Sequence, residues 1–294
     1  MRKGIIRDYY QLAKPGIIYG NLLTTVAAFF FATRWLFFFF GPHIIPLFFG
    51  TVVGISLVIG SACVFNNFLD KDIDADMSRT KDRALVTGMI SNRNAIIYAY
   101  ILGIIGFGVL LLFVNILTTA IAFFGFFMYV VVYTYAKRKT YWGALIGTIP
   151  GAVPIVVGYT AVTNRFDLTA FVLFFILIFW QMPHFYAIAI RRLDEYNAAG
   201  IPVFPAKKGV ETTKWHILLF IIMYVTATVL LAITASLGYT YLILVLFFGA
   251  AWLVLAVKGF KTLDNEKWAK RLFLFSLIIL LMFSLLIAVA PLLP

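Results

Sequence analysis

Four aspartates spaced two residues apart follow directly on a long apolar segment: Asp70, Asp72, Asp74 and Asp76. Carboxylates this close repel one another, and a divalent cation between them turns the repulsion into coordination. Mg²⁺ in particular is held by one or two carboxylates, while water and substrate phosphates fill its remaining positions. The stretch therefore indicates metal-assisted chemistry on a phosphorylated substrate.

Helical geometry divides these residues between two faces. If the helix that contains the apolar segment continues through the aspartates, Asn66, Asp70 and Asp74 recur every four residues on one face. Asn67 joins that cluster and adds a neutral oxygen, whereas the other two aspartates lie roughly 200° away, toward the loop. We predict that these four residues form the catalytic cluster, with Asn67, Asp70 and Asp74 as metal ligands.

Two other structures can carry closely spaced aspartates. An EF-hand calcium loop needs Gly at its sixth position and Glu at its twelfth, and Ala75 and Lys81 exclude it. A solvated charged loop beside a membrane is the plainer alternative, but the asparagines within the apolar segment favour the metal site. Arg79, Lys81 and Arg83 follow at once, and we predict that they bind the anionic phosphates of the substrate.

The elements that position this cluster follow from the composition, which is 63% hydrophobic and only 12% charged. Such a chain cannot hide its apolar surface in one soluble core. A membrane-spanning helix needs about 20 mainly apolar residues. Nine stretches qualify, at approximately 17–34, 44–68, 94–114, 117–136, 142–162, 167–190, 215–236, 239–257 and 272–292. We predict an all-α, polytopic membrane protein that forms a single domain over residues 1–294.

The basic residues predict the orientation of these spans. Of 24 Lys and Arg residues, 22 fall at the N-terminus and in alternate loops, and only Arg34 and Arg165 fall on the opposite face. The positive-inside rule then places the N-terminus and the aspartates in the cytoplasm and the C-terminus outside. The net charge of +12 is thus a topological signal, and its division among five short segments argues against a nucleic-acid partner.

Three further features bear on function. Cys63 is the only cysteine, which excludes an internal disulfide and a CxxCH haem attachment. His184 lies within a predicted span, about two turns from Arg191, and ionisable residues inside a membrane are functional candidates. A buried histidine bonded to a backbone carbonyl is the structural alternative. A stripe of glycines at intervals of four predicts close helix packing: Gly143, Gly147 and Gly151.

The NNxxDxxxD arrangement at residues 66–74 resembles the first aspartate-rich motif of the UbiA superfamily of intramembrane prenyltransferases. The resemblance covers almost the whole chain, because four stretches occur in the expected order: LAKPGIIYGN, NNFLDKDIDADMSRTKDR, YTYAKRKTYWGALIGTIPGAVPIVVGY and WQMPHFYAIAIRRLDEYNAAGIPVFP. These stretches are most similar to the superfamily members that farnesylate haem. A prenyltransferase acting on a quinone precursor is the alternative within the same fold.

The resemblance implies a reaction and its partners. Mg²⁺ would be the cofactor, farnesyl diphosphate the donor and the vinyl group of haem b the acceptor, giving haem O for terminal oxidase assembly. A haem substrate would give His184 a role as an iron ligand, since neutral imidazole commonly binds haem iron. The implied location is the lipid bilayer of a prokaryotic cytoplasmic (inner) membrane, with a haem A synthase or terminal oxidase as candidate downstream partner.

The chain departs from the superfamily at the second aspartate motif. Many members carry a DxxxD-like signature after the sixth span, whereas this chain has RRLDEY, with Arg191 where the first aspartate aligns. Asp194 remains as a candidate metal ligand, and the fork of Arg191 could pair with diphosphate in place of a second metal. We assign Lys137 and Arg138 to the diphosphate as well; anchoring of helix ends is the alternative for all three basic residues.

A transporter for haem or divalent cations is the alternative from another functional class. Transporters generally place coupling residues near the bilayer midplane on broken helices. Here 11 of the 12 acidic residues fall on the predicted cytoplasmic face, and only Asp167 falls on the other. The distribution of acids favours the enzyme.

Overall fold

The computed structural model describes residues 4–34, 43–78 and 80–294. All regular structure within these residues is helical, and nine segments are long and apolar enough to cross a membrane. These segments are α2 (Pro15–Thr33), α3 (Ile44–Leu69), α5 (Asn92–Phe113), α6 (Ile116–Phe127) continued by η3 (Met128–Tyr133) and α7 (Thr134–Lys139), α8 (Gly143–Thr163), α9 (Leu168–Arg191), α12 (Val210–Thr234), α13 (Tyr239–Lys258) continued by η4 (Gly259–Lys261), and α14 (Asn265–Val289) followed by η5 (Ala290–Leu292). The prediction of an all-α, multi-pass membrane protein is confirmed.

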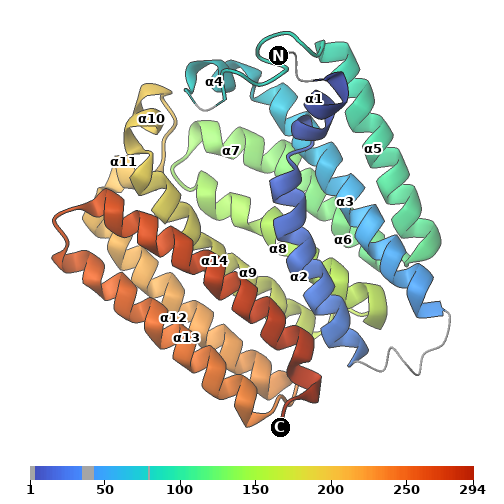
Figure 1. Cartoon of the computed structure of the whole chain (residues 1–294), viewed down its shortest axis with the longest axis vertical. Helices are drawn as coiled ribbons and strands as arrows, with labels where there is room; N and C mark the ends of the chain where they lie inside the picture. The colour runs from blue at the N-terminus through green and yellow to red at the C-terminus, as the bar shows by residue number, and fades with distance from the viewer. Residues whose placement is uncertain (1–3, 35–42, 79) are drawn as a thin grey trace.

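Four short helices complete the described structure: α1 (Ile5–Leu12), α4 (Lys71–Asp76), α10 (Leu193–Ala198) and α11 (Phe204–Lys208). They gather at the end of the bundle that carries the N-terminus, at the top of Figure 1, whereas the C-terminus lies at the opposite end. The short helices thus cover the end at which α3 delivers the aspartates. This end is called the site end below.

The bundle is organised around α8 and α9, which pack against each other and against α2, α12 and α14. On the other side α3 pairs with α5, which forms an outer layer (Figure 1). Large apolar side chains of α5 stay uncovered by protein, among them Ile104 at 71% and Leu112 at 79% exposure. Apolar surface on this scale is stable only against another apolar phase, so α5 faces lipid.

The glycine stripe of α8 allows neighbouring elements to approach closely, as predicted. A Cβ atom on Gly147 would lie 2.8 Å from the ring of Tyr133, and one on Gly143 would lie 2.8 Å from Cα of Lys137. Gly151 meets α9 in the same way. Small residues therefore let α8 support both η3 and α7, which carry side chains of the site described next.

Candidate active site

The aspartate-rich stretch does not simply continue α3. The helix ends at Leu69, and Asp70, with φ −98° and ψ 8°, separates it from α4. An uninterrupted helix, the condition on which the two-face argument was built, is therefore not present at this residue. Backbone hydrogen bonds nevertheless cross the break, since Asp70 N donates to Asn66 O (2.9 Å) and Asp74 N donates to Asp70 O (2.8 Å). The spacing of four along one face survives the interruption.

Burial separates the two predicted faces. The four residues assigned to the cluster are all buried: Asn66, Asn67, Asp70 and Asp74. The side chain of Asp72 is 66% exposed, and Asp76 is exposed as well. The helical spacing therefore predicts correctly which carboxylates face the protein.

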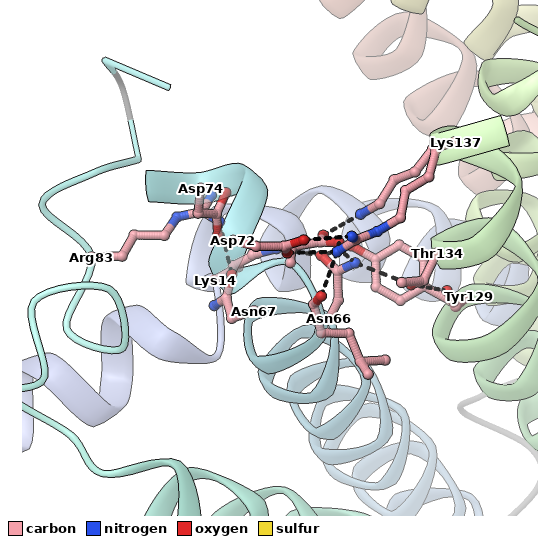
Figure 2. A network of polar contacts seen from close by, with 12 residues as sticks. Lys14, Asn66, Asn67, Asp72, Asp74, Arg83, Tyr129, Thr134 and Lys137 are labelled. Atoms are coloured by element: carbon pink, nitrogen blue, oxygen red, sulfur yellow. Dashed lines mark hydrogen bonds and ion pairs between the residues drawn. The ribbon is translucent and has the colours of Figure 1, made fainter. Parts of the chain in front are cut away.

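The two asparagines have different partners (Figure 2). Asn66 donates to Asp70 Oδ2 (2.8 Å), and its Oδ1 accepts a hydrogen bond from Lys14 Nζ (2.8 Å). Asn67 donates to the carbonyl of Leu12 (2.8 Å), so its Oδ1 turns toward Arg83 Nη1 at 2.9 Å. Asn66 thus orients a carboxylate, while Asn67 presents an oxygen.

Each buried carboxylate is paired with a cation from another segment. Asp70 forms an ion pair with Lys137 of α7. Asp74 forms one with Arg83, in the loop after α4 (Figure 2). Asp70 Oδ1, although buried, accepts no hydrogen bond, and Arg138 Nη2 lies 3.6 Å from it. A buried carboxylate oxygen without a donor is costly, and it marks a place where a further cation would be stabilised.

Arg138 is turned toward the exposed face. It holds Asp72 through two hydrogen bonds of 2.7 and 2.8 Å. These bonds lower the pKa of Asp72 to about 2, because the guanidinium stabilises the ionised carboxylate. Arg138 itself is not among the residues that line the cavity described below.

Lys14 belongs to the site, although its sequence position gave no chemical signal. It lies between α1 and α2 in a left-handed conformation (φ 54°, ψ 66°), and its ammonium points at Asn66. Burial lowers the pKa of Lys14 to about 8, with smaller contributions of the same sign from the charges of Arg83 and Lys137. The residue occurs in the stretch LAKPG, one of the four that carry the family resemblance.

A π-helical turn places two tyrosines beside this cluster. Within η3 the rings of Tyr129 and Tyr133 stack with centroids 5.5 Å apart, and Tyr129 OH lies 3.4 Å from Asn66 Oδ1. Single π-helical turns inside longer helices occur frequently at functional sites. Hydropathy does not distinguish such a turn from ordinary helix, so the sequence analysis missed it.

The cluster opens into a cavity of about 1250 Å³ at the site end. Its polar wall is formed by the four buried residues of the cluster with Lys14, Arg83 and Lys137. The other wall is rich in aromatic side chains: Tyr141, Phe185, Tyr186, Phe204 and Phe273. A charged anion and a large apolar group can therefore be held in one space.

Arg191 reaches this cavity from the end of α9. Its guanidinium lies 5.6 Å from the centre of the Phe273 ring, and its buried Nε donates no hydrogen bond. Asp194 is exposed on α10, and the described residues hold no group of three His, Cys, Asp or Glu that includes it. Lys81 is exposed and does not line the cavity, while Arg79 lies outside the described residues.

His184 lies within α9 and faces α14. Its Nδ1 is 2.8 Å from Ser276 Oγ, and its ring stacks on Trp180 and packs against Phe273, with centroids 5.1 and 4.8 Å apart. Because the hydroxyl of Ser276 donates to a backbone carbonyl at 2.6 Å, Nδ1 carries the proton and Nε2 keeps its lone pair. The cavity is lined by the neighbouring Phe185 and by Phe273, but His184 is not among its lining residues.

The polar wall suits a hard divalent cation. Two carboxylates and the Asn67 amide oxygen converge there, and Asp70 Oδ1 still lacks a hydrogen-bond donor. The described residues form no group of three His, Cys, Asp or Glu that could hold a metal ion without other ligands. This donor set is too sparse for a closed structural site and fits Mg²⁺, which retains water and binds phosphate oxygens.

Comparison with known proteins gives consistent matches. Residues 21–286 match the model of the UbiA prenyltransferase family. The chain is 45% identical over 291 residues to the protoheme IX farnesyltransferase of Photorhabdus laumondii, covering 99% of this chain and 97% of that protein. It is 44% identical over 292 residues to the protoheme IX farnesyltransferase of Sodalis glossinidius, covering 99% and 96%.

Solved structures share the fold at lower sequence identity. Digeranylgeranylglyceryl phosphate synthase superposes with a TM-score of 0.79 at 19% identity, over 97% of this chain and 98% of that one. A UbiA homologue from Archaeoglobus fulgidus, bound to GPP and Mg²⁺, superposes with a TM-score of 0.69 at 13% identity, over 96% and 99%. The arrangement of the nine spans is therefore one that solved prenyltransferase structures also adopt.

Proposed function

Since the chain belongs to the UbiA prenyltransferase family, we propose that it transfers a farnesyl group from farnesyl diphosphate to a vinyl group of haem b. The observation that carries the proposal is the pair of buried carboxylates, Asp70 and Asp74, in the polar wall of a cavity whose other wall is aromatic. The near full-length similarity to protoheme IX farnesyltransferases supports the choice of acceptor and donor.

Binding of the diphosphate would rearrange existing ion pairs. Asp70, Asp74 and the Oδ1 atom of Asn67 would hold Mg²⁺, which supplies electrostatic stabilisation of the departing diphosphate. Lys137 and Arg83, released from the carboxylates, would then turn to phosphate oxygens within reach of their present positions. The site exchanges one set of ion pairs for another, so little charge is left uncompensated.

The remaining residues would guide ionisation and capture. The allylic C–O bond of farnesyl diphosphate breaks, its electron pair leaves with the diphosphate, and the aromatic wall shields the farnesyl cation from premature capture by water. The vinyl group of haem b then attacks that cation. Water adds to the resulting carbocation and loses a proton, which gives the hydroxyethylfarnesyl side chain of haem O. No protein nucleophile is needed.

Two residues of α9 are proposed to handle the substrates at the second wall. Arg191, with a free buried Nε, would contribute its donors to the diphosphate. His184 would bind the haem iron through Nε2, the nitrogen that its bond to Ser276 leaves unprotonated. This role requires its ring to become accessible from the cavity, to which its neighbour Phe273 already belongs.

We propose that the site end faces the cytoplasm of a prokaryotic cell and that the protein resides in the cytoplasmic (inner) membrane. The support is the 22 to 2 distribution of basic residues between the faces. A reporter joined after Pro294 should be active only outside the cytoplasm, and cytoplasmic activity would contradict this orientation.

A competition assay with purified protein tests the proposed function. The protein is incubated with farnesyl diphosphate, Mg²⁺, haem b and an aromatic quinone precursor, and products are identified by mass. Farnesylated haem as the product supports the proposal. Farnesylation of the aromatic acceptor alone would assign the protein to the other branch of the family, and prenyl transfer to neither acceptor would contradict both.

A further inference from the structure

The short helix α1 exposes an apolar face beside the cavity. Ile5, Ile6 and Tyr10 are all exposed, Ile6 to 83%. An eight-residue helix is too short to be stable alone in water, so it requires contacts along its length. Leaving three large apolar side chains in water would weaken it further.

The other faces of α1 are in use. Tyr9 packs edge-on against Tyr98 at 5.1 Å, and Leu12 is buried in the same cluster. Arg7, Asp8 and Gln11 line the 1250 Å³ cavity. The helix is therefore one wall of the candidate active site, and among the described residues its protein contacts lie away from the exposed face.

The apolar face continues onto a membrane-spanning helix. Only Ala13 and Lys14 separate α1 from α2, and Tyr19 on the second turn of α2 is exposed as well. The hydroxyls of Tyr10 and Tyr19 lie 2.5 Å apart, which joins the two surfaces. We call this surface the N-terminal apolar patch: Ile5, Ile6, Tyr10 and Tyr19.

We propose that α1 lies in the interfacial layer of the bilayer, with the N-terminal apolar patch against lipid, so that the membrane surface holds one wall of the active cavity. A helix with an apolar face and a polar face lies in this layer, its apolar side chains at the boundary between head groups and acyl chains. Tyrosines favour the same depth, because the ring is apolar and the hydroxyl polar. Continuity with the first span places α1 at that depth.

The end of α1 is tied directly to the aspartate cluster. The carbonyl of Leu12 accepts the hydrogen bond that orients Asn67, and Lys14 in the next turn donates to Asn66. Figure 2 shows Lys14 and both asparagines converging from the two segments. The lipid contact of α1 therefore fixes the position of the carbonyl that turns Asn67 Oδ1 toward the site.

Site-directed fluorescence tests the placement without reference to catalysis. Because Cys63, the only cysteine, is buried, a cysteine introduced at position 6 is the accessible thiol. An environment-sensitive probe is attached to Ile6→Cys, Gln11→Cys or Leu263→Cys, and the whole protein is placed in phosphatidylcholine–phosphatidylglycerol vesicles. Leu263, exposed in the connection before α14, is the apolar control.

The proposal requires brominated lipid to quench the probe at position 6 several-fold more than the probes at positions 11 and 263. Iodide dissolved in the water should instead quench the probes at positions 11 and 263 more than the probe at position 6. Iodide quenching at position 6 equal to that at position 263 would overturn it. Protection of position 6 from both quenchers would also overturn it, because a second copy of the chain or another protein would then cover the patch.

A binding measurement tests the link to the site, and this part rests on the proposed function. In vesicles, the double variant Ile5→Ser/Ile6→Ser should bind a non-reactive farnesyl diphosphate analogue with Mg²⁺ about tenfold more weakly than the unaltered protein, as expected for disturbed orientation of a metal ligand. Leu263→Ser should bind it unchanged. Equal affinity of both variants would refute the link, whereas an unaltered protein that binds no analogue would refute the proposed function and leave the quenching result standing.

Discussion

Replacing Asp70 by Asn keeps the shape of the side chain but removes the negative charge at the centre of the cluster. Asp70 is buried, pairs with Lys137 and keeps Oδ1 free of hydrogen-bond donors. Altering groups that merely orient metal ligands typically costs 10–100-fold in metal affinity or activity. Loss of a charged ligand should therefore cost at least about 100-fold in Mg²⁺ affinity, or about 2.7 kcal/mol.

The matched control is Asp76→Asn, which removes the same charge from the exposed face of α4, the short helix that follows Asp70. A surface substitution of this kind changes free energies by about 0.5 kcal/mol or less, so the Mg²⁺ requirement should move by no more than about twofold. The assay first confirms that each variant accumulates in the membrane to the same level. Turnover of equal amounts of the purified proteins is then measured against Mg²⁺ concentration. Equal Mg²⁺ curves for the two variants would refute the assignment of ligands to the buried face.

Three further outcomes are expected. Affinity for a diphosphate analogue should fall as the pH rises above about 8, because the free protein loses the Lys14 proton there while the complex retains it. The Lys14→Met variant should lose this pH dependence, and a pH profile of binding equal to that of the unaltered protein would exclude Lys14 from the anion site. His184→Ala should shift the absorption spectrum of bound haem and weaken haem binding by about tenfold or more, yet leave the binding of the diphosphate analogue intact. An unchanged haem spectrum in this variant would leave His184 with a structural role. Gly158→Ala should destabilise the protein by about 1–3 kcal/mol, since the added Cβ would overlap the carbonyl of Thr25. Gly108→Ala should not, because a Cβ added at Gly108 would meet open space, and thermal unfolding in detergent measures both variants.

Much of the architecture could be predicted because hydropathy responds to the solvent around each helix. The spans, the burial of Asp70 and Asp74, and the exposure of Asp76 all follow from local spacing. The ends of the later helices could not be predicted from local spacing. The last helix begins at Asn265 rather than near residue 272, because its first turns carry lysines and arginine that extend beyond the apolar window.

The interactions that complete the site could not be predicted, since they join segments distant in sequence. Lys14 meets Asn66 across 52 positions, and Lys137 meets Asp70 across 67. Hydropathy also cannot reveal that the backbone geometry changes at Asp70, because the polarity of a side chain does not specify its φ and ψ angles. Such features depend on packing between helices, which no local pattern encodes.

The central claim is that the carboxylate cluster supports farnesylation of haem. The most direct measurement is the mass spectrum of haem extracted from membranes that overproduce the protein, beside membranes that contain the Asp70→Asn variant at the same level. The account predicts a haem heavier than haem b by the mass of one farnesol in the first membranes and only haem b in the second. Unmodified haem in both, with donor and Mg²⁺ supplied, would contradict it.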